Sequence, residues 1–495
     1  MARTPKTSKA KLKADNKSRN RLLLIPVVAL VIKISIIARI QGFDWFAAGG
    51  GDVAKGLGIL LDKNYIPAHA WYGADGENYI RGLWELVSRG LFSPEGKLSY
   101  WPAGYPLLMW PLLVIFKGSF FAFLAFFQSL IYALGCFYFV DELRRTRLAK
   151  FSLFVAIFLS FNPTLALNTI AVGYELPAVG LSLIAFASMM RFLRLQKKSL
   201  ISFENISASI SFSLASFMQP RILVIALVLL LIWALASFRI GFAAAFLAIS
   251  MAIVAIAPAT LMWRNKEANG FAVISTNLGV TMGIGAGPDA TGGYNGKYNG
   301  VPCPAADKAA NAAKADNAKV KCILQWYVSH PIRTIQLAWN KSVYFWSPWV
   351  GPAANGTMAR NPWRINHPLT NTLKTESGFK LVYGNAGKLL SWSWMIATLA
   401  LMIYGFLLLW RAGSLERVLG LAAFLSVLVN WLSSVATIGD HRFRIPTMGF
   451  SLFLQIVGFL SLFLKGRNRL VGTPTQVTWP ALHWKADSPP DNLPS

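Results

Sequence analysis

The chain has 495 residues, of which 55% are hydrophobic and 14% are charged, and its formal net charge is +27. Soluble domains carry about 25% charged residues, so this composition excludes a soluble globular protein. The apolar residues form continuous runs and do not alternate with polar ones, which excludes a β-barrel. The basic residues are spread over short loops and both ends of the chain, which argues against a nucleic-acid partner. We predict an all-α polytopic membrane protein.

In chain order, residues 1–21 are basic and are expected to form a cytoplasmic tail beside an anionic leaflet. Residues 22–465 form the predicted transmembrane domain, because apolar runs of this length can cross about 30 Å of hydrocarbon. The polar, proline-rich residues 466–495 are expected to form a second cytoplasmic tail without fixed structure. About ten transmembrane helices are predicted, at 22–40, 119–140, 150–170, 174–193, 203–219, 221–238, 241–262, 389–410, 415–436 and 445–465.

The positive-inside rule orients these helices. Ten crossings place the basic turns and both termini in the cytoplasm, and leave two large loops outside the cell membrane, at 41–103 and 264–388. The apolar stretch from Tyr105 to Phe116 is too short to span and is interrupted by prolines, so we expect a re-entrant or interfacial helix there.

One basic loop breaks this charge pattern. Residues 439–446 read Gly-Asp-His-Arg-Phe-Arg-Ile-Pro, and the predicted topology places them outside. His441, Arg442 and Arg444 are therefore candidates for binding an anionic phosphate. Arg221 and Arg264 stand at the outer ends of two predicted helices on the same face, although a single interfacial arginine often only extends its charge into the headgroup layer.

Carboxylates are scarce, and seven of the 21 lie in the first outer loop. Asp75 and Glu77 alternate there with small and aromatic residues, so Asp75 could act as a general base or cap the following helix, and both interpretations stay open. A divalent metal bound by this pair also stays open. Glu175 begins a helix, where a carboxylate either complements the helix dipole or contributes to a pocket. Cys303 and Cys322 share the second outer loop, where a disulfide is plausible.

These motifs, in this order, resemble those of membrane glycosyltransferases of the GT-C fold. The nearest likeness is to the bacterial relatives of protein O-mannosyltransferases and of the lipid A aminoarabinose transferase. The resemblance covers about residues 70–460 and is carried by Asp75 to Tyr79, Pro102-Ala-Gly-Tyr-Pro-Leu107, Asn162-Pro163 with Glu175, Gln219-Pro-Arg221, Arg264-Asn265, Ser275-Thr-Asn277, Ala290-Thr-Gly-Gly-Tyr294 and Arg442-Phe-Arg-Ile-Pro446.

The chain also departs from the family pattern. The family's acidic pair is usually adjacent, whereas Gly76 separates Asp75 from Glu77 here. Extra residues precede Asp75, and Asp44 lies near the start of this insertion. Asp44 or Glu77 could therefore be the base, although Asp75 matches the motif best.

The resemblance implies a polyprenyl-phosphate sugar donor and an acceptor hydroxyl on a glycan, lipid or protein at the outer face. Asp75 would take the acceptor proton in an inverting displacement, with no cofactor required. The donor phosphate would be bound by Arg221, Arg264, His441, Arg442 and Arg444. The substrate pocket would include Tyr79, Tyr105, Glu175 and Asn277. A transporter or flippase of a lipid-linked glycan, and a glycan polymerase or ligase, are the alternative functions.

Overall fold

The computed structural model describes residues 19–20, 22–35, 45–62, 74–94, 96–162, 164–165, 172–195, 198–294, 300–347 and 384–463. Every regular element within these ranges is an α-helix or a 3-10 helix. By length and composition, six helical segments could cross a membrane: Gly104–Leu143, Glu175–Leu193, Ile240–Asn269, Trp392–Arg411, Ser414–Ala436 and His441–Phe463. The prediction of an all-α polytopic membrane protein is confirmed.

Each predicted transmembrane segment coincides with a helix in the described part of the chain. The first is the short apolar helix Leu22–Ser35. The others are α7 (Phe120–Leu143), α8 (Ser152–Phe161), α10 (Glu175–Leu193), α11 (Phe203–Met218), α12 (Ile222–Ser237), α13 (Ile240–Asn269), α20 (Gly384–Arg411), α21 (Ser414–Ala436) and α22 (Met448–Phe463). The predicted cytoplasmic tails lie mostly outside the described residues.

Helix α10 forms the centre of the bundle. It packs against α7 on one side and α11 on another, and most of its side chains are buried. Gly180 of α10 meets Gly135 of α7 so closely that a Cβ atom at Gly135 would come within 2.3 Å of the Gly180 carbonyl oxygen. Small residues permit such close helix packing in membranes. A second group is built from α20, α21 and α22, and α12 joins the two groups by packing on α21.

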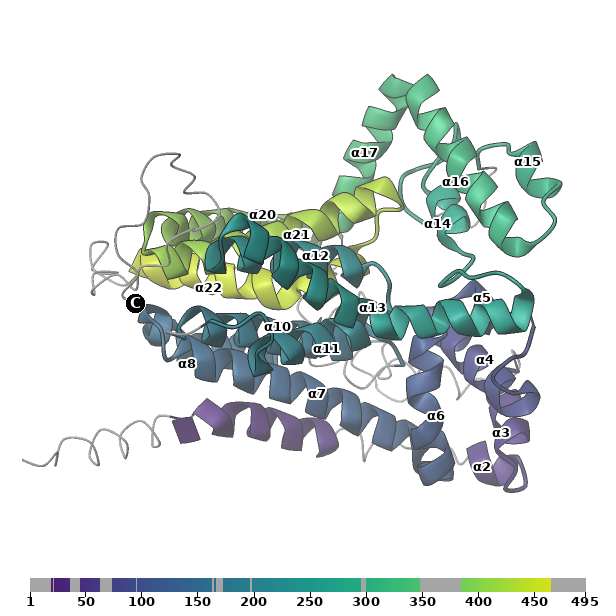
Figure 1. Cartoon of the computed structure of the whole chain (residues 1–495), viewed down its shortest axis with the longest axis horizontal. Coiled ribbons are helices and arrows are strands. Elements are labelled where there is room, and N and C mark those ends of the chain that lie inside the picture. The colour runs from purple at the N-terminus through teal and green to yellow at the C-terminus, as the bar shows by residue number, and fades with distance from the viewer. Residues whose placement is uncertain are drawn as a thin grey trace, which may run out of the picture.

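The two ends of the bundle differ (Figure 1). One end carries α2 (Trp45–Ala48), α3 (Val53–Leu60), α4 (Ala74–Arg89), α5 (Lys97–Tyr100) and α6 (Gly104–Phe116), together with α14 (Leu278–Ile284), α15 (Pro304–Asp307), α16 (Ala312–Ser329) and α17 (Pro331–Trp346). Apart from α6, which directly follows the first of them, these elements come from the two loops predicted to be extracellular, so we call this end the outer end.

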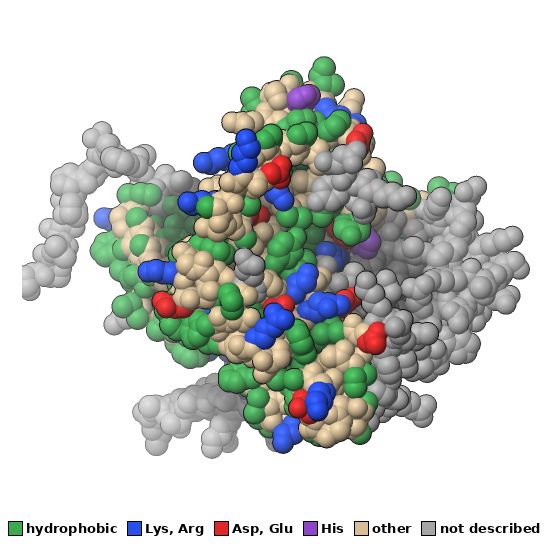
Figure 2. All heavy atoms as spheres, turned by 90° about the vertical axis from the view of Figure 1, so that its right-hand side faces the viewer, with side chains coloured by type: hydrophobic (Ala, Val, Ile, Leu, Met, Phe, Trp, Pro, Cys, Tyr) green, Lys and Arg blue, Asp and Glu red, His purple; other side chains and the backbone are tan. Residues whose placement is uncertain are grey.

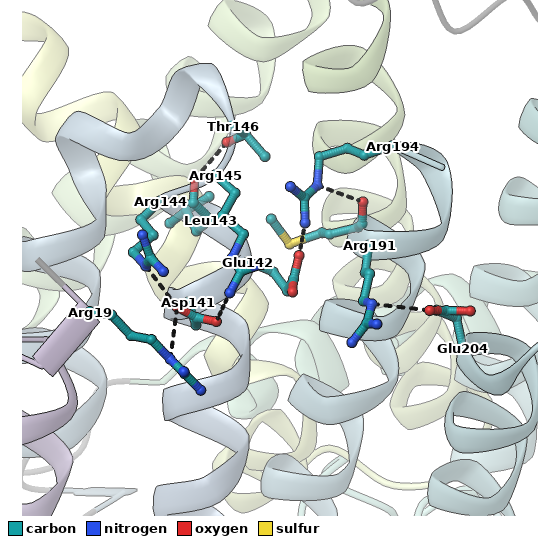
Figure 3. A network of polar contacts seen from close by, with 11 residues as sticks. Arg19, Asp141, Glu142, Leu143, Arg144, Arg145, Thr146, Arg191, Arg194 and Glu204 are labelled. Atoms are coloured by element: carbon teal, nitrogen blue, oxygen red, sulfur yellow. Dashed lines mark hydrogen bonds and ion pairs between the residues drawn. The ribbon is translucent and has the colours of Figure 1, made fainter. Parts of the chain in front are cut away.

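The opposite end holds a network of ion pairs (Figure 3). Asp141 at the end of α7 pairs with Arg144 and Arg145, each at 2.7 Å. Glu142 pairs with Arg194 after α10, and Arg191 pairs with Glu204 of α11 at 3.0 Å. The network ties together α7, α10 and α11, and it gathers the basic turns that were predicted to share one face.

Helix α6 is the short apolar helix expected beside the membrane surface. It ends at Phe116, and a 3-10 turn, η2 (Lys117–Ser119), separates it from α7. Lys117 has a φ of 38°, a left-handed conformation that turns the chain sharply. Figure 1 shows α6 running across the direction of α7 at the outer end of the bundle. This arrangement agrees with an interfacial helix.

Helix α13 continues beyond its predicted end at residue 262. It ends at Asn269, where Gly270 adopts the left-handed conformation with a φ of 77°. Arg264, the first residue of the predicted second outer loop, therefore lies inside the helix. Helix α8 ends at Phe161, and Asn162 is not helical, because a residue preceding proline is disfavoured in a helix. Residues 164–165 are helical again, and the rest of the predicted span after Asn162 lies outside the described residues.

Candidate functional site

Arg221 stands at the outer end of the bundle, immediately before α12. Its guanidinium lies 4.0 Å from the centre of the Phe443 ring, and one of its Nη atoms donates a hydrogen bond to Thr437 Oγ1 at 3.2 Å. No ion pair joins it to a carboxylate in the part of the chain that the structure describes. Burial lowers the pKa of Arg221, and the nearby charge of Arg442 adds to this effect. The site thus holds a half-buried cation whose donors are mostly unused by the described residues.

Arg442 approaches the same aromatic ring. Its guanidinium lies 5.1 Å from the Phe443 ring centre, and Arg442 Nε is 3.6 Å from Asp440 Oδ2. Asp440 also caps the 3-10 helix η5 (His441–Thr447) by accepting a hydrogen bond from the Arg442 backbone N–H at 2.9 Å. His441 Nδ1 is 3.7 Å from Asp440 Oδ1. Arg221 and Arg442 therefore meet at Phe443, and Asp440 lies beside both Arg442 and His441.

Arg444 faces a different part of the protein. Its guanidinium is buried, and it donates hydrogen bonds to the backbone oxygens of Ser347 at 2.9 Å and Trp346 at 3.4 Å. These contacts hold the last turn of α17 against η5. Arg444 belongs to the same loop as Arg442, but its hydrogen bonds to the end of α17 give it a structural role.

Arg264 does not join this group. It is 2% exposed, and it donates hydrogen bonds to the Leu91 and Ser93 carbonyl oxygens at 2.8 and 2.7 Å and to Ser99 Oγ at 2.8 Å. A further bond goes to Asn265 Oδ1 at 2.7 Å. These bonds clamp the end of α13 onto the chain between α4 and α5. The structure thus gives Arg264 a structural role, and its predicted phosphate contact stays a prediction.

Three tyrosines connect α4 to the arginines. The buried ring of Tyr79 on α4 packs edge-on against Tyr105 at 5.0 Å and against Tyr174 at 6.2 Å, measured between ring centres. Tyr174 OH accepts a hydrogen bond from Gln219 Nε2 at 2.8 Å, and Gln219 precedes Arg221 by two residues. Burial raises the pKa of Tyr174, and the neighbouring carboxylate of Glu175 adds to this effect. A continuous set of contacts therefore runs from α4 through Tyr174 and Gln219 to Arg221 and the basic loop at 439–446.

Tyr105 of α6 is held by a residue of α7 and by the backbone just before α10. Its hydroxyl donates to Gln128 Oε1 at 2.7 Å and accepts from the Gly173 backbone N–H at 3.0 Å. Gly104 is required beside it, because a Cβ atom there would come within 1.9 Å of the Phe217 carbonyl oxygen. Glu175 is buried in the first turn of α10, at the positive end of the helix dipole. This position agrees with the first of its two interpretations, in which the carboxylate complements the dipole.

The carboxylates of the first outer loop divide into two sets. Asp52 caps α3 by accepting from the Lys55 N–H at 3.0 Å, and Glu85 accepts from the Lys97 N–H at 2.8 Å. Glu77 forms an ion pair with Arg81 one turn along α4, at 2.7 Å. Asp44 lies outside the described residues, and so does the side chain of Asp75.

The backbone position of Asp75 is nevertheless informative. Helix α4 begins at Ala74, so Asp75 lies in its first turn and does not precede it as a cap would. Asp75 and Tyr79 are four residues apart, which places them on the same face of the helix. Since Tyr79 packs on Tyr105 and Tyr174, this face of α4 is the one that leads to Arg221.

Asn277 and the cysteines belong to the second outer loop. Asn277 precedes α14, and its Oδ1 accepts from Ser275 Oγ at 3.1 Å. The neighbouring Thr276 N–H donates to the Ser99 carbonyl oxygen at 3.1 Å, which links this segment to α5. Cys303 and Cys322 are joined by a disulfide that ties α16 to the chain just before α15, with Cα atoms 5.8 Å apart.

Lys341 was not predicted from the sequence as a residue of this region. This side chain of α17 is 1% exposed, and its Nζ donates to Tyr327 OH on α16 at 2.8 Å. Burial lowers its pKa to about 8. Gly285 separates Lys341 from Thr437, because a Cβ atom at Gly285 would come within 3.0 Å of Lys341 Cε and 2.2 Å of the Thr437 carbonyl oxygen. No local pattern marks this residue, since its burial depends on segments distant in the sequence.

The outer face shows the result of this arrangement. Figure 2 shows basic side chains gathered over the middle of the face, with apolar and a few acidic side chains between them. Among the described residues, no three histidine, cysteine or acidic side chains are grouped so that they could hold a metal ion. The described groups at Phe443 are suited to binding an anion.

No family model matches the sequence, and no curated protein matches it. Among solved structures, the apo crystal structure of the Archaeoglobus fulgidus oligosaccharyltransferase matches with 12% identity and a TM-score of 0.44, over 88% of this chain and 50% of that chain. The archaeal oligosaccharyltransferase AglB from the same organism, in complex with an inhibitory peptide and a dolichol-phosphate, matches with 12% identity and a TM-score of 0.42, over 92% of this chain and 53% of that chain.

This chain thus spans about half the length of the solved structures that it matches. A likeness of this size assigns no activity. The function proposed below depends on the residues of this chain.

Proposed function

We propose that this membrane protein transfers a sugar from a polyprenyl-phosphate donor to an acceptor hydroxyl at the outer face of the cell membrane. The observation that carries the proposal is the pair of arginines, Arg221 and Arg442, on one aromatic ring at the outer end of the bundle. Asp440 lies beside Arg442, and an anion bound next to Arg221 would further offset the repulsion between the two guanidinium groups. A phosphate on a lipid carrier supplies that anion at the headgroup level.

The chemistry requires little else. The acceptor oxygen attacks the anomeric carbon, the bond from that carbon to the phosphate oxygen breaks, and the acceptor proton passes to a carboxylate. The polyprenyl phosphate leaves with an additional negative charge, so it needs cations near the breaking bond and no general acid. A single displacement of this kind inverts the anomeric configuration. We assign charge stabilisation to Arg221 and Arg442, with His441 beside Asp440 as a further candidate.

We assign the base to Asp75. Three other carboxylates of the first outer loop already bind protein groups: Asp52, Glu77 and Glu85. Asp75 stands on the face of α4 that carries Tyr79, and the tyrosine cluster connects this face to Arg221. Tyr79, Tyr105 and Glu175 then surround the reacting groups. The acceptor belongs to a glycan, a lipid or a protein.

The first experiment identifies the sugar. Mass spectrometry of the envelope glycans of a deletion strain and its parent would show which residue disappears. The purified protein is then reconstituted with the corresponding polyprenyl-phosphate sugar, and transfer is measured for the parent, for Asp75→Asn and for Asp52→Asn. Since Asn also caps helices, Asp52→Asn should transfer sugar normally. Asp75→Asn should lose about 100- to 10,000-fold in rate.

The same vesicles test the main alternative. If the parent protein moves labelled donor lipid across the bilayer in the absence of an acceptor, and transfers no sugar when an acceptor is added, the chain is a flippase and the proposal is wrong. Full activity of Asp75→Asn would leave glycosyl transfer in place but would remove Asp75 as its base.

A further inference from the structure

Helix α17 has two apolar faces. One face is buried and consists of Leu337, Lys341 and Phe345, at 0%, 1% and 0% exposure. The opposite face is exposed although it is also apolar. It consists of Ile332, Ile335, Trp339 and Val343, at 75%, 70%, 71% and 38% exposure. At about 3.6 residues per turn, these four side chains occupy roughly a quarter of the helix circumference. We call them the α17 apolar stripe.

The direction of the stripe follows from the contacts of the buried face. Lys341 binds Tyr327 of α16 and lies against the backbone at Gly285 and Gly292, so the buried face is turned towards α14 and α16. Figure 1 shows α14 and α16 on the side of α17 that is farther from the long helices. The stripe, on the opposite side, is therefore turned towards the flank of the bundle. Helix α17 runs across the direction of the long helices and projects beyond them.

The base of α17 is anchored to a candidate membrane span. Ser342 Oγ accepts a hydrogen bond from Trp431 Nε1 of α21 at 3.1 Å. The residues that follow these two partners, Val343 and Leu432, are both apolar and exposed, at 38% and 51%. Exposed apolar side chains therefore stand next to this contact on both α21 and α17. Because the exposed sides of spanning helices face lipid, the stripe begins where the lipid-facing surface of the bundle ends.

The chemistry of the hairpin formed by α16 and α17 fits the same surface. Trp339 carries the type of ring that is enriched at membrane interfaces. Helix α16 contributes Lys314, Lys319 and Lys321 against one acidic residue, Asp316, which suits anionic headgroups. We propose that α17 lies in the headgroup layer of the outer leaflet and inserts its apolar stripe into the lipid.

Spin-label accessibility tests this proposal on the full chain. The variant Cys136→Ala removes the free cysteine and keeps the disulfide. Ile335→Cys then places a label on the stripe, and Asn317→Cys places a control label at an exposed position of α16. Both proteins are reconstituted in vesicles of phosphatidylcholine and phosphatidylglycerol, and quenching by oxygen is compared with quenching by a water-soluble nickel chelate.

The proposal predicts opposite preferences at the two positions. The label at position 335 should be relaxed more by oxygen than by nickel, and the label at position 317 more by nickel. Equal preference for nickel at both positions would show that the stripe faces water and would overturn the proposal. Dipolar broadening between labels at position 335 that persists on dilution with lipid would assign the stripe to a second copy of the chain, and would also overturn it. Neither outcome affects the proposed sugar transfer.

Discussion

The guanidinium of Arg221 lies 4.0 Å from the centre of the Phe443 ring, and the guanidinium of Arg442 lies 5.1 Å from the same centre. The two arginines belong to elements more than 200 residues apart, and a hydrogen bond from Arg221 to Thr437 spans a separation of 216. Phe443 therefore fixes the positions of two like charges that would otherwise move apart. Substitutions of Arg221 and of Phe443 therefore test the pair directly.

Arg221→Gln should lower the rate of sugar transfer by about 100- to 1,000-fold, because it removes a cation from the departing phosphate. Arg221→Lys should recover only part of this loss, because an ammonium does not provide the planar fork of donors that binds phosphate. Transfer from labelled donor in vesicles measures both. Arg239→Gln, at an exposed arginine that precedes α13, is the matched control and should be fully active. Normal transfer by Arg221→Gln would contradict the assignment.

Phe443→Leu should weaken donor binding by about 2- to 30-fold, which corresponds to the loss of cation–π contacts of about 0.5–2 kcal/mol. The effect should appear in the KM for the lipid donor more than in the rate at saturation. Phe443→Tyr keeps the aromatic face and should bind donor as the parent does. If leucine and tyrosine gave the same KM, the ring would not be supporting the arginines.

Gly104→Ala should destabilise the protein by about 1–3 kcal/mol, as overpacking does, because its Cβ atom would meet the Phe217 carbonyl oxygen at 1.9 Å. Helix α6 would have to move away from α11, and Tyr105 would move with it. Thermal unfolding in detergent measures the change. Gly241→Ala is the control, since no atom lies within 4 Å of a Cβ atom there and alanine favours a helix. An unchanged melting temperature for Gly104→Ala would show that the contact is easily relieved.

Lys341 predicts how stability depends on pH. Its pKa falls from 10.5 to about 8 on burial, so between these pH values the unfolded chain binds more protons than the folded chain. Stability therefore rises with pH across this window, by roughly 3 kcal/mol at most. Lys341→Met should lack this rise. The melting temperatures of parent and variant, measured from pH 7 to pH 10.5, give the difference.

Lys321→Met, on the exposed side of α16, is the control for this comparison. It should show the same pH dependence as the parent protein. If Lys341→Met also kept that dependence, the buried amine would not be its source.

The membrane-spanning part of the fold could be predicted from the sequence because it depends on local properties. An apolar run of sufficient length forms a helix in lipid whatever its neighbours are. The differences concern helix ends, and their signals were present: Gly270 follows the end of α13, and Asn162, where α8 ends, precedes a proline. The stripe on α17 could also have been found, since Ile332, Ile335 and Trp339 follow helical spacing.

The site was harder to predict because it depends on contacts between distant segments. From their positions alone, Arg221 and Arg264 were both predicted to bind the donor phosphate. Arg264, however, donates hydrogen bonds to the loop between α4 and α5. Phe443 was seen only as part of a motif, and nothing in its neighbours indicates that Arg221 packs on it. The burial of Lys341 depends in the same way on Tyr327 and Gly285, which no periodicity connects to it.

The clamp made by Arg264 has a consequence for biosynthesis. Its acceptors lie at Leu91, Ser93 and Ser99, more than 160 residues earlier in the chain. When the ribosome has finished the first outer loop, that loop still lacks the arginine that fastens it. These hydrogen bonds can therefore form only after α13, the seventh predicted span, has been synthesised, so the order of translation makes them late contacts of the first outer loop.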